Sequence, residues 1–507
     1  MDRTNAIAGS LPARPDRRIL QAGTWGGVAA ACAFGFLADA AARAPSGLAL
    51  TLGTWLAGAA VLVLVRPRRA VAPFVVAACA IGACLTVRAS PVLTGLNVLA
   101  AGALLCAGAS FATLGAPIAT TTRSYLARLV WSPLQAMPKG AASLAGPPTR
   151  LLRARRGTAG GLARGLLLVV PVALALLALL ASADAVFARY VRVPIRVEPG
   201  SIASHVLVLA IGALALATLV AVGTLGPSTI DAAAQRPARP AWARAGDWVA
   251  LLVVADVIFG AFVAVQFSVF FGGRGQVLTA EGLTYAEYAR TGFWQLLGAT
   301  AIAGGVLAFA WAALPRPMPR PVRLLFQALG LVLIVFVLVV LVSAFRRLAL
   351  YEAAYGYTWL RVLVHTAILA IGALLLCTMV AVVRARAAWL PFAAVVIATA
   401  AVLGLNIVNL DAFIATRNIS RAANGAQLDV RELRQLSADA APSMAAALDS
   451  LTPAARTDLE GALACMRDEL ERQTASGWAG SNRARHLALE TLRDRLFPPC
   501  RAPRRPF

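Results

Sequence analysis

Eleven long apolar segments dominate the amino-acid sequence. Many of them have a length close to that of a membrane-spanning α-helix, which is about 20 residues. Only 14% of the residues are charged, whereas soluble proteins average about 25%. This composition excludes a soluble enzyme, a secreted disulfide scaffold and a disordered chain. The sequence therefore predicts an all-α, polytopic integral membrane helical bundle of about 11 transmembrane helices, with a small helical extracytoplasmic C-terminal domain. The segments lie near residues 20–42, 47–65, 70–87, 92–114, 165–183, 203–225, 247–271, 293–314, 324–345, 360–383 and 388–410.

Basic residues are distributed unevenly between alternate loops. If the N-terminus is cytoplasmic, the cytoplasmic segments hold 23 basic residues and the outer segments hold 10. Positively charged loops stay in the cytoplasm, so we expect a cytoplasmic N-terminus and an extracytoplasmic C-terminus in the cytoplasmic (inner) membrane. Residues 1–408 carry 33 basic and 11 acidic residues, which is +22 of the net charge of +24. This surplus belongs to membrane loops, and no nucleic-acid partner is expected.

The apolar segments divide the chain into five parts. Residues 1–19 are a cytoplasmic segment, and 20–114 hold the first four transmembrane helices. The first of these is interpreted as an uncleaved anchor, because its apolar stretch is too long for a signal peptide. Residues 115–164 form a basic cytoplasmic loop with a helix on the anionic inner leaflet, which makes membrane lipids a partner. A short link folded under the bundle is an equal alternative. Residues 165–410 hold helices five to eleven, and 411–507 form an extracytoplasmic helical tail domain.

The tail has the pattern of short amphipathic helices. Thr452 followed by Pro453 is typical of a helix start, and this helix is expected to end near Thr474. Another helix is expected to begin at Ser481. Its predicted buried face consists of Leu487, Leu489, Leu492 and Leu496.

Two of the seven cysteines, Cys465 and Cys500, lie in the tail, and the other five lie in apolar segments. Because the tail is expected in an oxidising compartment, the two are predicted to form a disulfide. The alternative is a pair of free thiols, one buried and one near the frayed end of the chain.

Few polar residues fall inside the apolar segments. Asp256 lies midway along the seventh segment, with Gln266 further toward its end, and Asp39 lies near the end of the first. An ionisable group inside a bilayer costs roughly 2.5–3.5 kcal/mol, so it needs a partner or a role. For Asp256, one interhelical hydrogen bond is favoured over a proton or ion relay. Asp39 is expected to be solvated. The three histidines lie in separate elements, so neither a metal nor a cofactor is expected.

A larger polar set falls at the outer ends of the segments, at one membrane depth. Arg361 and His365 are spaced i, i+4 and share one helix face. The functional interpretation is an outward-facing pocket, and the alternative is a structural ring of ion pairs and interfacial tyrosines. We expect Arg361 to pair with Asp184, Glu352 or Asp411. The set consists of Asp184, Tyr285, Glu287, Arg290, Glu352, Tyr355, Arg361, His365, Asn409 and Asp411.

The same regions carry a resemblance to a known family. The chain resembles bacterial multi-pass membrane proteins of the type catalogued as domain of unknown function 4173. The resemblance covers about residues 160–445 and implies a membrane location and a topology, without an activity. It rests on the stretches 182–187, 283–290, 350–361, 409–415 and 428–439.

Three functions remain open from the sequence. The favoured one is a non-enzymatic envelope protein that senses, regulates or scaffolds, with the tail binding a partner protein of the envelope. The second is a transporter of a small or lipid-like solute that uses Asp256 or the outer cluster. The third is an outward-facing enzyme on a lipid-linked substrate, with Asp184, Glu287 or His365 as acid or base.

Overall fold

The computed structural model describes most of the apolar helices and the tail. Within the described residues, all regular structure is helical, as the composition predicts. The described ranges are 17–44, 46–65, 68–111, 199–222, 245–271, 319–387, 389–474 and 477–500, with single positions near 136–144 and 300–307.

Nine apolar helices occupy nine of the eleven predicted segments. The segment 165–183 lies outside the described residues, and so does most of 293–314. The basic loop 115–164, apart from four positions, lies outside them too. The nine helices are α1 (Arg17–Ala42), α2 (Leu48–Leu64), α3 (Arg68–Val87), α4 (Pro91–Phe111), α8 (Pro199–Val222), α10 (Ala245–Phe271), α14 (Arg320–Tyr355), α15 (Trp359–Val383) and α16 (Leu390–Val408).

Five of these helices are long and apolar enough to cross a membrane. They fall in α4, α8, α14, α15 and α16, and the described apolar parts of α1, α2, α3 and α10 are shorter. Large apolar side chains such as Val257, Leu369 and Ile407 point out of the bundle and are exposed. A helix that is apolar on its outer face as well as its inner face suits a lipid environment. The described helices are therefore those expected of a membrane protein.

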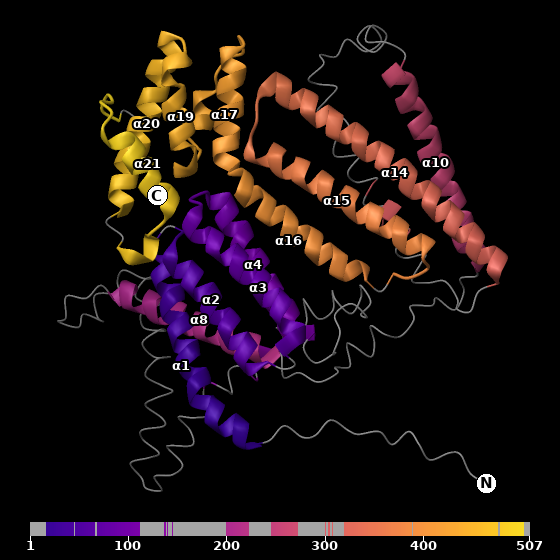
Figure 1. The fold of residues 1–507 in the computed structure, drawn as a ribbon, viewed down its shortest axis with the longest axis horizontal. Helices are drawn as coiled ribbons and strands as arrows, with labels where there is room; N and C mark the ends of the chain where they lie inside the picture. Colours follow the sequence, from indigo (N-terminus) through magenta and orange to yellow (C-terminus); the bar gives the residue numbers. More distant parts are fainter. Residues whose placement is uncertain are drawn as a thin grey trace, which may run out of the picture.

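The apolar helices pack in two connected groups (Figure 1). Helices α2, α3 and α4 pack together, and α8 lies along α1. Gly35 and Gly212 permit this close crossing, because a Cβ on Gly212 would lie 2.9 Å from Gly35 Cα. Helices α10, α14, α15 and α16 form a row. Helix α16 also contacts α3 and α4, and an edge-to-face contact of Phe392 with Phe74 joins the two groups.

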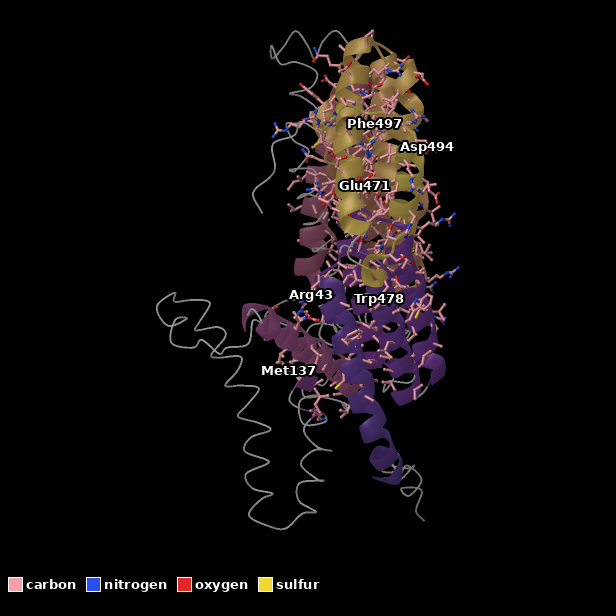
Figure 2. All side chains as sticks on the ribbon, turned by 90° about the vertical axis from the view of Figure 1, so that its left-hand side faces the viewer. Arg43, Met137, Glu471, Trp478, Asp494 and Phe497 are labelled. Atoms are coloured by element: carbon pink, nitrogen blue, oxygen red, sulfur yellow. A yellow bond between two sulfur atoms is a disulfide. The ribbon has the colours of Figure 1, made fainter. Side chains whose placement is uncertain are left out.

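The tail is a cluster of short helices at one end of the bundle, and we call that end the tail side (Figures 1 and 2). Its core includes Ile414, Leu433 and Met444, which are fully buried. The same apolar cluster continues into Leu93 of α4 and Leu405 of α16. The tail and the bundle therefore share one core. The tail elements are α17 (Leu410–Ala423), α18 (Val430–Leu433), η3 (Ala438–Ala440), α19 (Ala441–Ala447), η4 (Leu448–Ser450), α20 (Pro453–Thr474), η5 (Trp478–Gly480) and α21 (Arg483–Arg493).

The last helix differs from its prediction. It begins at Arg483 rather than at Ser481, because the Asn482 side chain caps it by accepting from the backbone N–H groups of residues 484 and 485. The buried face includes Ala484, Ala488 and the predicted Leu492. The predicted core residues Leu487 and Leu496 are exposed. Helix α20, in contrast, has the predicted bounds.

Cys465 of α20 and Cys500 are joined in a disulfide, with their Cα atoms 4.7 Å apart. This bridge ties the segment after α21 back to α20. A crosslink that closes a loop of about 35 residues stabilises a fold by roughly 3–4 kcal/mol in the chain-entropy model.

Replacing Cys465 with serine is therefore expected to lower the thermal stability of the tail. Replacing Cys377, a free cysteine in α15, should leave it nearly unchanged and serves as the control. Mass spectrometry of the non-reduced, digested protein should detect the peptide that links positions 465 and 500. Free alkylation of both thiols in protein isolated under oxidising conditions would contradict the bridge.

Candidate functional site

A buried group of polar side chains lies where the tail meets the tail-side ends of α3, α4, α15 and α16. We call this group the polar junction. Its members come from five separate parts of the sequence, and most of them are buried. They are Arg88, Ser90, Asn97, Trp359, Asn406, Asp411, Ser437, Asp439 and Asn482.

Asp439 is the tail residue that binds the turn between α3 and α4. Its Oδ2 accepts from the backbone N–H of Ala89 at 2.6 Å and of Ser90 at 3.1 Å. Its Oδ1 lies 3.5 Å from Nη1 of Arg88. The N–H groups before α4 have no partner inside that helix, and the helix dipole favours a negative charge there. Asp439 thus caps α4 from a distance of 350 residues in sequence.

Asp411 is a second buried carboxylate in the polar junction, with no exposed surface. It accepts from the indole N–H of Trp359 at 2.7 Å, the backbone N–H of Ser437 at 3.0 Å and the hydroxyl of Ser90 at 3.4 Å. Ser90 and Ser437 both donate to Asp439 as well. Two serines therefore bridge the two carboxylates. A carboxylate without a cation in contact needs such donors to remain buried.

Arg88 and three asparagines complete the polar junction. Arg88 Nε donates to the carbonyl of Asn406 at 2.7 Å, near the end of α16. A cation at a helix C-terminus is favourable. The amides of Asn97 and Asn406 exchange two hydrogen bonds between α4 and α16. Asn482 donates to the carbonyls of Leu85 and Arg88 at the end of α3. Backbone groups at three helix ends are thus satisfied by side chains from remote segments.

Burial raises the pKa of Asp439, and the neighbouring Asp411 raises it further, while the Ala89 N–H and Arg88 act in the opposite direction. The carboxyl group of Asp439 therefore binds its proton more tightly in the folded protein than in the unfolded chain. The stability that Asp439 contributes through this proton is present below the unfolded pKa of about 4 and is lost as the pH rises through the folded value.

We expect the wild type to lose stability relative to Asp439→Asn as the pH rises from about 4 through the raised pKa. Melting curves of both proteins in detergent across this range measure the difference. Asp449→Asn, at an exposed carboxyl in the same tail, is the control. A difference between wild type and Asp439→Asn that does not change with pH would contradict the assignment.

Glu352 and His365 form a separate pair between α14 and α15. Glu352 is 2% exposed, and its Oε1 lies 3.0 Å from Nδ1 of His365. The His365 ring packs edge-on against Phe345. Its Nε2 is buried and has no hydrogen-bond partner among the described residues. The pair joins the two helices, and its geometry resembles that of a carboxylate that orients an imidazole.

Helix α17 holds the end of α14. Arg421 donates to the carbonyls of Ala353 and Ala354, which are among the last groups of α14. Asn418 accepts from the backbone N–H of Tyr357 at 2.7 Å and donates to its carbonyl at 2.9 Å. The tail therefore binds the turn between α14 and α15 as it binds the turn between α3 and α4.

The described members of the predicted outer cluster divide between these groups. Among the described residues, Arg361 forms no ion pair with Glu352 or Asp411. It donates instead to the Gly356 carbonyl and lies 4.4 Å from the centroid of the Tyr351 ring. Tyr355 is exposed and contacts Tyr351. Asn409 has a left-handed backbone conformation, and its side chain caps α17 by accepting from the backbone N–H of Ala412. The candidates outside the described residues are Asp184, Tyr285, Glu287 and Arg290.

The intramembrane candidates have different surroundings. Both carboxylate oxygens of Asp256 are buried without a hydrogen-bond partner among the described residues. Gln266 lies in α10. Asp39 is not simply solvated, because it contacts Arg43 and lies 2.7 Å from Nδ1 of His205 on α8. In the described part of the chain, no three His, Cys, Asp or Glu side chains form a group that could hold a metal.

Several important residues were not among the sequence candidates. Arg88 and Asn482 lie at helix ends without a local motif, and Asp439 is only the last residue of a stretch that carries the family resemblance. One signal was available: a Ser-Pro step at residues 90 and 91 marks a helix start. It does not reveal that the cap comes from the tail.

Residues 74–447 match the family described as a domain of unknown function (DUF4153). The match reaches from α3 into α19, so it includes Arg88, Asp411 and Asp439. It also crosses the boundary expected at residue 411 between bundle and tail. The number 4173 suggested by the resemblance is not the one that matches, while the expectation of an uncharacterised family holds. No curated protein and no solved structure matches the chain. Because the match covers most of its length, the chain belongs to the DUF4153 family.

Proposed function

We propose that this protein is a non-enzymatic sensing, regulatory or scaffold protein of the bacterial envelope. In this proposal about eleven helices span the cytoplasmic membrane, the N-terminus is cytoplasmic, and the tail lies outside and binds an envelope protein. The supporting observation is the way in which the tail is attached. A buried polar junction and a shared core fix it to the ends of both helix groups.

This attachment suits a protein that transmits a state between tail and membrane. Asp439 contacts the turn between α3 and α4, and Arg421 contacts the end of α14. A partner that shifts the tail would thus act on both helix groups at once. The described carboxylates of the polar junction already have donors, whereas a catalytic carboxylate must be free to reach a substrate.

The proposed orientation can be tested by a reporter fusion. Alkaline phosphatase fused after residue 507 folds only outside the cytoplasm, and it should be active in a bacterial host. A cytoplasmic reporter at the same position should be silent. The reverse pattern would overturn both the orientation and the extracytoplasmic tail.

The interaction role can be tested by photocrosslinking in intact cells. A photoreactive amino acid at Leu487, which is exposed on α21, should give one discrete adduct with an envelope protein. The buried Leu492 on the same helix is the matched control and should give none. If exposed tail positions give no protein adduct in cells that contain a stable protein, the tail is not an interaction module.

A transporter is the second candidate because of Asp256. Its carboxylate oxygens lie within α10 without a described partner, and an ionisable group in that position marks many ion pathways. The hydrophobic reagent dicyclohexylcarbodiimide modifies protonated carboxyl groups in apolar surroundings. Labelling of Asp256 that a specific cation prevents would favour transport, and labelling insensitive to every cation would favour the regulatory role.

A further inference from the structure

An aromatic pair lies where the base of the tail meets α1. Trp478 of η5 stacks on Phe36 of α1, with ring centroids 6.5 Å apart and planes 21° apart. Both side chains remain exposed, Trp478 by 49% and Phe36 by 56%. Figure 2 shows Trp478 at the end of the tail nearest the bundle, at about the height of Arg43. The pair thus belongs to the tail and the bundle together.

The backbone around Trp478 is held in place by α2. The N–H of Leu48 donates to the carbonyl of Ser481 at 3.1 Å. Gly47 allows this approach, because a Cβ there would lie 2.8 Å from the carbonyl carbon of Gly480. Ala479 is buried, so the neighbour of Trp478 points inward while the indole points outward. The exposed position of Trp478 is therefore fixed by the fold.

The residues near Trp478 and Phe36 indicate the depth at which this aromatic pair would lie in a bilayer. Phe36 belongs to the apolar surface of α1. Asp39, Arg43 and His205 gather further along, where the end of α1 lies beside α8. Trp478 thus lies where an apolar surface gives way to charged groups. An indole has a large apolar face and one N–H donor, and tryptophan is enriched at the boundary between lipid tails and headgroups.

We infer that Trp478 and Phe36 form a lipid-binding surface, with the indole seated among the glycerol and upper acyl groups of the tail-side leaflet. The occupant is the interface of a glycerophospholipid bilayer, because the surface continues the exposed apolar face of α1. This contact sets the height of the tail above the membrane. It requires that the apolar helices lie in a bilayer, and it is independent of any partner of the tail.

Depth-dependent quenching tests this inference on the full-length protein in phosphatidylcholine nanodiscs. The protein has 10 tryptophans, so the signal of Trp478 is the difference between wild type and Trp478→Phe. Lipids brominated near the glycerol should remove more of this signal than lipids brominated deep in the chains. Aqueous iodide should remove little of it.

Trp55 provides a control for depth. It is 47% exposed on α2, inside the apolar segment, so the Trp55→Phe difference signal should be quenched more by the deep bromines. If Trp478→Phe melts earlier than wild type, Trp478→Tyr replaces it, because tyrosine keeps an aromatic ring with a polar group. A Trp478 signal that iodide quenches and brominated lipids do not would overturn the inference.

Discussion

Replacing Asp439 with alanine is expected to lower the free energy of unfolding by about 3–5 kcal/mol, the cost of breaking a buried charged pair. The substitution leaves the N–H groups of Ala89 and Ser90 without their acceptor and leaves Arg88 without its carboxylate. Thermal unfolding in detergent measures the loss. Hydrogen exchange should rise at the start of α4 and in η3 together, because the same side chain joins them.

Asp449→Ala is the matched control for this substitution. Asp449 is a carboxylate in the same tail, but it is largely exposed and pairs only with the half-exposed Arg456. Exposed ion pairs contribute about 0–1 kcal/mol, so this variant should melt close to the wild type. Equal losses from both substitutions would show that Asp439 does not connect the tail to the bundle.

Gly356→Ala is expected to destabilise the protein by about 2–4 kcal/mol, as the sum of backbone strain and disturbed hydrogen bonds. Gly356 has φ +82° and ψ −179° at the end of α14, a conformation that side chains disfavour. A Cβ there would also lie 2.7 Å from Oδ1 of Asn418. The amide of Asn418 forms two hydrogen bonds with the backbone of Tyr357, so it cannot move away from the new Cβ without breaking them.

Gly425→Ala separates the two causes. Gly425 has φ +91°, but a Cβ there would meet no atom within 4 Å. This variant carries only the backbone cost of about 1 kcal/mol or somewhat more, and its melting temperature should fall less than that of Gly356→Ala. If the two variants lose the same stability, the contact between α17 and the end of α14 contributes nothing.

The sequence predicts the apolar helices well, because each is encoded by its own stretch of residues. The long segments that became α14, α15 and α16 needed no information from elsewhere in the chain. The polar junction could not be found in this way. Asp439 and Ala89 are 350 residues apart, and neither has a local pattern that points to the other.

The predicted buried face of α21 is partly wrong for a local physical reason. Leu487 precedes the buried Ala488 by one residue and therefore points about 100° away from it, and Leu496 lies beyond the end of the helix at Arg493. The sequence predicts that Arg361 pairs with a carboxylate at the same depth, and one candidate, Asp184, lies outside the described residues. Among the described residues, Arg361 contacts a carbonyl and an aromatic ring, which are acceptors that a count of charges does not reveal.

The core shared by tail and bundle has a consequence for how the protein is made. The turn between α3 and α4 leaves the ribosome long before Asp439, so its N–H groups and Leu93 lack their final neighbours while most of the chain is still being synthesised. The last helices to be made close the part of the bundle that was made early. The packing of this part of the bundle is therefore completed only after the C-terminal tail has been synthesised. A chain that stops before residue 439 would insert its apolar helices yet leave the start of α4 open to capture by chaperones and proteases.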